Sequence, residues 1–277
     1  MSSTPPVHVR ITGRRSWFDF GIRELWHFRD LIGILAMRDI KLRYRQTATG
    51  VVGVVLQPIL AAGVLTFVFG RVAKLPSEGV PYFAFSYAGF LGWNVFANMV
   101  SRSSGVLVGN SNLVSKIYFP RLLLPLSGIF VGVIDLGIAA IVMVAIMAAY
   151  QLVPGIAILT APLWIVGILS VGMGLGVVAG AVMVYYRDVG TATTAVLQVL
   201  LYLTPVAYSA TAVPAEFRSL YTLNPLATFV EGLRWSILAT GRPSAGRTLL
   251  SAVFAVVVLL AGCVVFTRLE RSFADVI

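Results

Sequence analysis

The sequence predicts an all-α integral membrane protein with six transmembrane helices. Two features of its composition indicate this class: 58% of the 277 residues are hydrophobic and only 12% are charged, whereas a soluble domain carries about 25% charged residues. The mean hydropathy of +0.90 agrees with this assignment. Because so few charges cannot cover a water-facing surface, the composition excludes a soluble globular enzyme and a disordered chain.

The third observation is the length of the segments that lack Asp, Glu, Lys and Arg. A helix needs about 20 residues to cross about 30 Å of hydrocarbon. The run 136–186, which extends back through 122–134 across Asp135, is therefore too long for one span, and we divide it at 150–162, where Pro and Gly cluster. The predicted spans are 50–71, 82–103, 122–149, 160–184, 191–208 and 248–267.

Basic residues predict the orientation of these spans. An even number of spans places both termini on the same side of the membrane. With the termini inside, 15 basic residues lie inside and six outside. Because positive charge concentrates on the cytoplasmic side, we expect cytoplasmic N- and C-termini. Nothing in the first 30 residues resembles a signal peptide.

The segment before the first span divides into a cytoplasmic tail, residues 1–22, and an amphipathic helix, residues 23–45. Leu25, Phe28, Ile32 and Leu35 form an apolar stripe on this helix, a pattern typical of helices that lie on a membrane surface. We interpret it first as an anchor, and alternatively as a contact for a partner or an anionic lipid. Residues 46–277 form the transmembrane domain.

Two connections are long enough to hold further helices. In 103–121, Asn110, Ser111 or Asn112 can cap a short helix through Tyr118, although an ordinary polar connector is the alternative. In 209–247 we expect two short helices that enter the outer leaflet, or else lie on its surface. The second of them carries Glu231 and Arg234, which at i, i+3 can neutralise each other.

Within the spans, small and polar residues mark contacts between helices. Gly172, Gly176 and Gly180 recur every four residues, a spacing that lets membrane helices approach closely. Asp135 is the one acid expected deep in the membrane. It is interpreted as a carboxyl group hydrogen-bonded to a neighbouring helix, with a proton or substrate site as the alternative.

Sequence signals for catalysis are missing. The chain contains no G-x-x-x-x-G-K-[ST], no H-E-x-x-H and no G-x-S-x-G motif. Its single cysteine, Cys263, cannot form an internal disulfide. We therefore expect no catalytic residue, metal or cofactor in this chain, and a transport pathway driven from outside it.

Four stretches resemble the membrane permease of ABC-2 type exporters, specifically the group that exports O-antigen, capsule and teichoic acid. These stretches run from Arg38 to Pro58, from Asn112 to Pro125, from Tyr185 to Val189 and from Leu223 to Trp235. The resemblance implies a homodimeric channel, served by two copies of an ATP-binding subunit that carries ATP and Mg. It implies export of a polysaccharide linked to a polyprenyl diphosphate, from the cytoplasmic to the outer face.

The resemblance also suggests roles for individual residues. Contacts to the ATPase are expected at Ser111, Asn112, Lys116 and Tyr118. The short outer helices, 215–222 and 226–240, would cap the channel exit. Cations for the diphosphate are expected at Arg38, Lys41, Arg43 and Arg45, for which plain membrane anchoring is the rival explanation. Aromatic residues expected to line a sugar path are Phe83, Phe85, Tyr87 and Tyr202.

Two other classes of function remain at this point. One is an ABC-2 permease for a small molecule or drug, which the aromatic crowding and the Tyr118–Arg121 stretch disfavour. The other is a membrane enzyme of lipid-linked sugar metabolism, for which Asp135 is the only candidate carboxylate.

Overall fold

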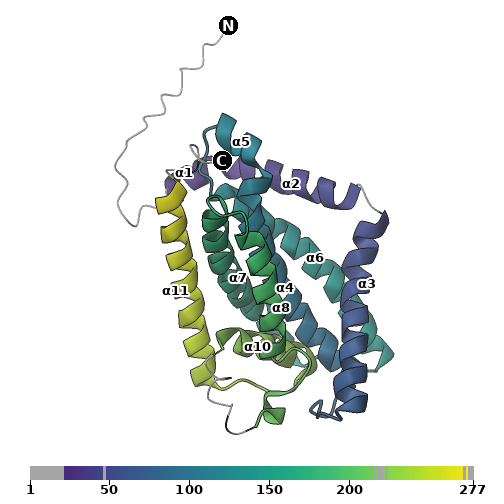
Figure 1. The fold of residues 1–277 in the computed structure, drawn as a ribbon. Helices are drawn as coiled ribbons and strands as arrows, with labels where there is room; N and C mark the ends of the chain where they lie inside the picture. Colours follow the sequence, from purple (N-terminus) through teal and green to yellow (C-terminus); the bar gives the residue numbers. More distant parts are fainter. Residues whose placement is uncertain are drawn as a thin grey trace.

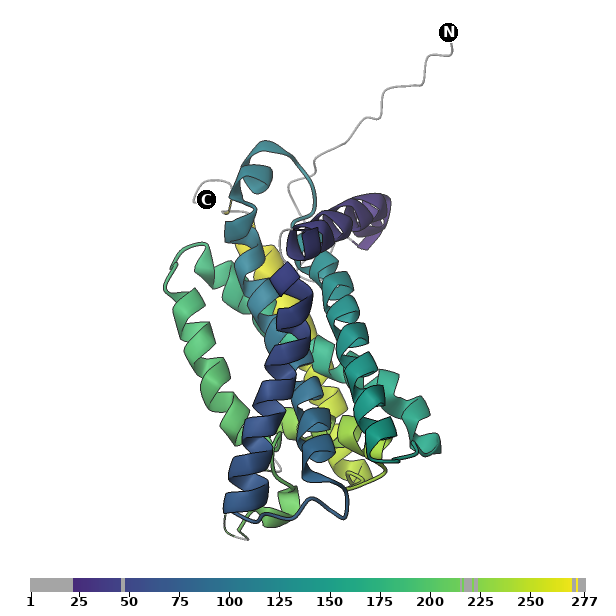
Figure 2. The same ribbon diagram turned by 90° about the vertical axis from the view of Figure 1, so that its right-hand side faces the viewer.

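The computed structural model describes residues 22–45, 48–214 and 224–270, together with 216, 221 and 273. Its described residues form helices and connecting loops, without a strand. Most helices run side by side, and short helices lie across both ends (Figures 1 and 2). We refer to these as the α2 end, where α1 (Ile22–His27), α2 (Arg29–Arg45) and α5 (Ser111–Lys116) lie, and the α10 end, named for α10 (Pro225–Leu238).

The expected amphipathic helix is two helices, α1 (Ile22–His27) and α2 (Arg29–Arg45). The single helix predicted over 23–45 is thus corrected by a break at Phe28, where Leu31 N–H bonds the Phe28 carbonyl three residues back, at 3.0 Å. Helix α2 lies across the bundle instead of continuing into it (Figure 1). It buries Leu35 and Ala36 and exposes Ile34 and Met37.

Four of the expected spans coincide with helices long and apolar enough to cross a membrane. They cover Val55–Val72, Leu123–Ala149, Ile156–Met183 and Ala245–Leu269. The first combines α3 (Ala48–Leu65) with a π-helical turn (Thr66–Val72), and the others contain α6 (Leu123–Ala149), α7 (Ala161–Met183) and α11 (Ala245–Leu269). The predicted break at 150–162 is confirmed, because α6 ends at Ala149 and α7 begins at Ala161.

The two remaining spans stay predictions. Helix α4 (Tyr82–Gly109) has 28 residues, and α8 (Val189–Leu203) is apolar but has only 15. A helix of that length covers less than the about 20 residues that a perpendicular crossing needs.

Helix α7 is the centre of the bundle and packs against α4 and α11. Gly172, Gly176 and Gly180 face α4, and a Cβ atom on Gly176 would lie 2.6 Å from Ser103 Cβ. On the side toward α11, a Cβ atom on Gly262 would lie 2.5 Å from the Gly174 carbonyl oxygen. Glycine therefore lets α7 contact both neighbours through bare backbone, as in small-residue membrane interfaces.

Burial differs sharply between the spans. In an apolar 18-residue window of the Ile156–Met183 span 56% of the residues are buried, against 11% in Val55–Val72. Helix α3 stands at the edge of the bundle (Figure 1). It therefore leaves most of its surface to lipid or to another molecule.

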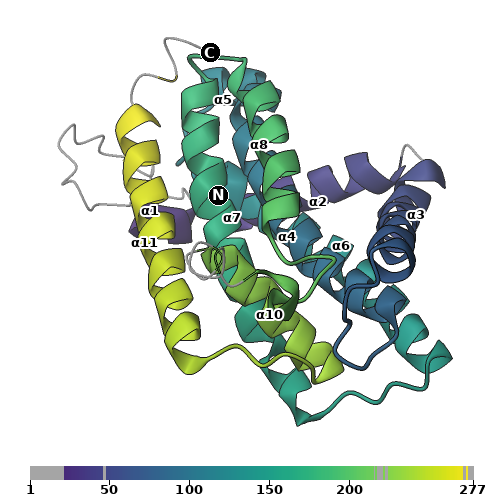
Figure 3. The same cartoon turned by 60° about the horizontal axis from the view of Figure 1, so that its bottom comes forward.

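At the opposite end from α2, helix α10 (Pro225–Leu238) packs against α4, α7 and α11 (Figure 3). Asn224 caps it, since Asn224 Oδ1 accepts a hydrogen bond from Leu226 N–H at 3.1 Å, and Pro225 occupies the first position, where no N–H is required. Of the other short outer helix, predicted over 215–222, only residues 216 and 221 are among those described.

The expected pairing of Glu231 with Arg234 is corrected. Glu231 Oε2 instead lies 3.0 Å from Arg247 Nη2, in the first turn of α11. Arg234 donates to the carbonyl groups of Pro205 and Val206. The i, i+3 spacing predicted a shared helix face correctly, but partners brought by other segments displaced the local pair.

Candidate functional site

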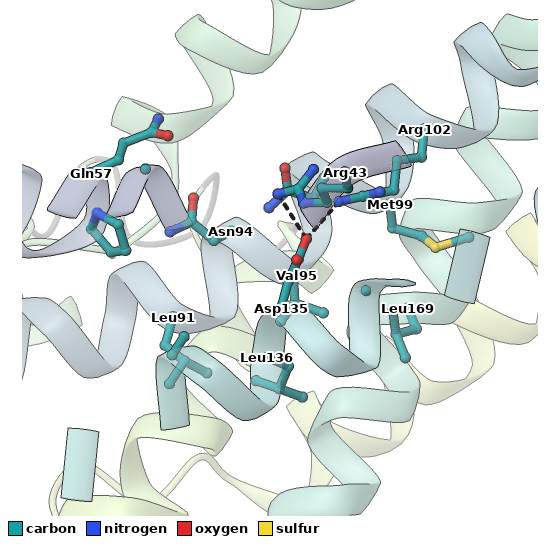
Figure 4. A pocket seen from close by; sticks show the side chains of 15 residues that line it. Arg43, Gln57, Leu91, Asn94, Val95, Met99, Arg102, Asp135, Leu136 and Leu169 are labelled. Atoms are coloured by element: carbon teal, nitrogen blue, oxygen red, sulfur yellow. Dashed lines mark hydrogen bonds and ion pairs between the residues drawn. The ribbon is translucent and has the colours of Figure 1, made fainter. Parts of the chain in front are cut away.

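A polar cavity of about 360 Å³ lies within the bundle near the α2 end, where α2, α3, α4 and α6 meet. Most of its lining is apolar. The polar side chains that line it, most of them labelled in Figure 4, are Arg43, Gln57, Asn94, Asn98, Arg102 and Asp135. Such groups are costly inside a membrane unless they serve each other or a pathway.

Asp135 of α6 is bound by three polar side chains at this cavity and is 7% exposed. Its Oδ2 accepts from Arg102 Nη2 of α4 at 2.5 Å and lies 3.0 Å from Arg43 Nη2 of α2. Its Oδ1 accepts a 2.5 Å hydrogen bond from the Tyr44 hydroxyl. One carboxylate thus connects α2 and α4 to α6 (Figure 4).

The Tyr44 hydroxyl is held in its neutral, donating form. Burial, and then the hydrogen bond to Asp135, raise the pKa of Tyr44 to about 12. Because both Asp135 oxygens already accept from donors, the carboxylate serves as a structural acceptor in this arrangement. This geometry supports the interpretation of Asp135 as a carboxyl group bonded to neighbouring helices, and it disfavours a general base.

A second polar connection joins α2 to α5 (Ser111–Lys116). Arg38 Nη2 donates to Asn110 Oδ1 at 2.7 Å, and it also pairs with Asp39 at 2.7 Å. Asn110 Nδ2 donates to the Val106 carbonyl at 2.8 Å. The Asn110 side chain therefore does not cap α5, which corrects one of the three proposed caps, but fixes the α4–α5 turn against α2.

The residues expected to contact an ATPase lie around α5 and are accessible. Asn112 and Lys116 are exposed, Ser111 is half-buried, and Tyr118 is 61% exposed. Val114 and Phe119 are buried and anchor the segment to the bundle. The α2 end thus presents a short helix with an anchored inner face and an open outer face.

The cations expected to hold a diphosphate are divided by the structure. Arg38 and Arg43 contact Asn110 and Asp135, whereas Lys41 is exposed on α2. The side chain of Arg45 lies outside the described residues. Lys41 lines an open groove along α2 that also includes Arg29 and Arg38.

The expected channel aromatics do not share one environment. Phe85 and Tyr87 are buried in the core of the chain itself; the Phe85 ring lies 3.9 Å from the Arg234 guanidinium, and the Tyr87 hydroxyl donates to the Ala139 carbonyl at 3.0 Å. This burial argues against these two as channel-lining residues, a correction to the sequence-based expectation. Phe83 is partly buried, and Tyr202 of α8 is 67% exposed.

The carboxamides of the cavity were missed from the sequence. Gln57, Asn94 and Asn98 lie in runs chosen for their lack of charge, which hid their polarity. Each carboxamide both donates and accepts hydrogen bonds, so together they suit water or hydroxyl groups. Among the described residues, no group of three His, Cys, Asp or Glu side chains could hold a metal ion.

Comparison with known proteins gives a family for this fold and site. Residues 30–238 match the model of the ABC-2 type transporter family. The matched segment includes α2 from its second residue onward, the cavity, α5 and the whole of α10.

Curated relatives align over nearly the whole chain. A protein of Klebsiella pneumoniae named O-antigen export system permease protein RfbA is 23% identical over 92% of this chain and 97% of its own length. A protein of Myxococcus xanthus with the same name is 26% identical, over 92% of this chain and 98% of its own length.

Proposed function

The chain belongs to the ABC-2 type transporter family, and from this premise we propose that it is the transmembrane permease subunit of an ATP-driven polysaccharide exporter. The substrate class comes from relatives named for O-antigen export, which align over 92% of the chain. The observation on the molecule that carries the proposal is the connection from α5 through Arg38 and α2 to the Asp135 cavity.

We infer that this connection transmits movement from an ATP-binding subunit. An ATPase that contacts Lys116 and Tyr118 would displace α5, and the Arg38–Asn110 hydrogen bond would carry the displacement to α2. Arg43 and Tyr44 of α2 bond Asp135, so the same movement would reach α4 and α6. The steps from the α4–α5 turn to α2 and from α2 to α6 use hydrogen bonds and an ion pair.

We further propose that the substrate is linked to a polyprenyl diphosphate and is captured at the α2 end. Lys41 is the exposed cation of α2, and a phosphate group accepts hydrogen bonds readily from such a donor. Arg29 and Arg38 in the same groove add positive charge, opposed by Asp30. Plain anchoring by positive charge is the rival explanation.

The assembly that we propose is a homodimer with two ATP-binding subunits, which bind the ATP and Mg. It lies in a bacterial inner membrane with the α2 end and both termini in the cytoplasm. Helix α3, with its mostly unburied surface, is available for a second copy. The α10 end then faces outward.

The first experiment isolates the tagged protein from its native membranes in mild detergent. We expect an ATP-binding subunit in equal amount, and ATP hydrolysis that vanadate inhibits. Depletion of the protein should cause a lipid-linked glycan to accumulate on the cytoplasmic side. Absence of a nucleotide-binding partner under conditions that preserve a control complex would refute the proposal, and accumulation of a small molecule would redirect it to another substrate class.

A second experiment tests the proposed ATPase contact with a matched pair of variants. Lys116→Glu should lower co-purification of the ATP-binding subunit at least several-fold, because the charge of the contact is reversed. Lys74→Glu makes the same change at an exposed lysine of the opposite end and should leave it unchanged. Equal effects of the two variants would argue against a contact through α5.

Capture of the headgroup is tested at Lys41. Lys41→Glu should reduce export while the ATP-binding subunit still co-purifies. Lys41→Arg, which keeps the positive charge, should export like the wild type. Mere anchoring predicts instead that Lys41→Glu lowers the amount of protein in the membrane and spares export per molecule.

A further inference from the structure

The α10 end contains a second polar cavity, of about 190 Å³, outside the connection described above. Its lining comes from α10, the α10–α11 loop, the first turn of α11 and the segments that precede α4 and follow α8. The charged residues that line it are Glu78, Glu231, Arg234, Arg242 and Arg247. With three guanidinium groups against two carboxylates, the lining carries an excess of positive charge.

Arg234 is fixed at this cavity and is only 3% exposed. Its Nη2 donates to the carbonyl groups of Pro205 and Val206, and its guanidinium lies over the Phe85 ring. Its Nε has no hydrogen-bond partner among the described residues. The side chain is therefore held rigidly with one donor unused.

A second guanidinium and a hydroxyl at this cavity also have donors without a hydrogen-bond partner among the residues that the structure describes. Arg247 contacts Glu231 through Nη2, but Arg247 Nε and the Thr240 hydroxyl have no hydrogen-bond partner in the described part of the chain. Glu231 is 7% exposed, and its Oε1 is an unused acceptor there. Buried polar groups normally have partners, because leaving one unpaired is unfavourable.

The unused groups define the chemistry of a ligand. Two guanidinium N–H groups require acceptor oxygens, and the excess positive charge requires an anion. The Glu231 acceptor requires a donor, such as a hydroxyl group on the same ligand. The cavity has room for several water molecules, and thus for one phosphate group or one sugar acid.

We propose that this cavity binds a small hydroxyl-bearing oxyanion, either hydrogen phosphate or the carboxylate of a single sugar acid. The ligand bridges Arg234 of α10 to Arg247 of α11. Guanidinium groups suit such ligands because their planar N–H donors match the oxygens of phosphate and carboxylate. Binding therefore stabilises the contact between α10 and α11 at this end of the molecule.

The test uses the full-length protein in lipid nanodiscs and does not depend on export. Inorganic phosphate, glucuronate and glucose are titrated by calorimetry, and thermal unfolding is followed in phosphate, in glucuronate and in chloride at equal ionic strength. We expect saturable binding and a higher Tm with phosphate or glucuronate, and no binding of glucose. Preference for glucuronate identifies a glycan acid as the source, and preference for phosphate identifies a phosphate group.

Arg247→Gln should weaken this binding by at least about tenfold, since a charged hydrogen bond contributes about 1.5–3 kcal/mol. Arg71→Gln removes an exposed guanidinium at the same end and should bind like the wild type. If Arg247→Gln fails to fold, the milder Thr240→Val must weaken binding instead. Identical unfolding of the wild type in phosphate, glucuronate and chloride, or binding that these cavity variants leave unchanged, would overturn the proposal.

Discussion

Asp135 shows how one residue can determine the local arrangement of several helices. A carboxylate inside a membrane is tolerated only with donors around it, and here Arg43, Tyr44 and Arg102 supply them. The donors come from two helices other than its own. We therefore expect Asp135 to hold α2, α4 and α6 together, and not to transfer protons.

Replacing Asp135 by Asn tests this role. Asn keeps the shape but removes the negative charge, so Arg43 and Arg102 would face each other without compensation. We expect a loss of about 1–3 kcal/mol in stability and reduced export, with thermal unfolding in nanodiscs as the measurement. Asp135→Glu keeps the charge, so its Tm should fall between those of the wild type and Asp135→Asn. Full stability of Asp135→Asn would show that the charge is dispensable.

The hydrogen bond of Tyr44 predicts that the folded protein loses stability at alkaline pH. Its pKa is raised to about 12 in the folded protein, against about 10 in an unfolded chain, so its contribution to stability is complete below pH 10. It is lost as pH rises from about 10 to 12. Tyr44→Phe should therefore flatten the decline of Tm over the accessible part of this range, and an unaltered decline would contradict the assignment.

At the residue scale the sequence predicted types of group better than partners. It identified Asp135 as unusual but gave no partner, because Tyr44 lies 91 positions away in the chain. It paired Glu231 with Arg234 because the two share a helix face, whereas Arg247 comes from another helix. Long-range pairs leave no spacing pattern that a single sequence can show.

At the scale of elements, the packing of α7 depends on its glycines, which have no side chain. Gly172, Gly176 and Gly180 were predicted to be packing positions, and each lies against the backbone or Cβ atoms of α4. The matching contact between Gly174 and Gly262 was not predicted, because one glycine in α11 forms no repeat. Helix boundaries set by charged residues and by the 150–162 turn were recovered well, whereas the break at Phe28 had no sequence signal.

Gly176→Ala tests the close approach of α7 and α4. The new Cβ atom would lie 2.6 Å from Ser103 Cβ and 2.9 Å from the Val100 carbonyl oxygen, and such overpacking costs about 1–3 kcal/mol. Gly137→Ala in α6 is the matched control, since its Cβ atom would meet nothing within 4 Å. The Tm should fall for the first variant alone; a similar fall in both would indicate a general effect of helix glycines.

At the scale of the whole molecule, the two ends differ in construction. The α2 end has an exposed helix α5 with Lys116, and the α10 end has a largely buried helix at its centre. The proposed orientation places the first in the cytoplasm and the second outside. The sequence supported this through charge counts alone, without showing which surfaces are open.

Cysteine labelling measures this orientation directly. In a Cys263→Ser background, Lys74→Cys should react with a membrane-impermeant maleimide in intact spheroplasts. Lys116→Cys should react only after permeabilisation. The reverse pattern would invert the proposed direction of transport.

The packing of α7 also has a mechanical consequence. Because its glycines lie against backbone and Cβ atoms of α4 on one side and against the backbone of α11 on the other, these three helices cannot slide past one another without breaking close contacts. These three helices are therefore expected to move as one rigid unit. Helix α3, with only 11% of its spanning window buried, is the least buried of the four candidate spans, so we expect the movement proposed for α2 to displace α3 relative to these three helices.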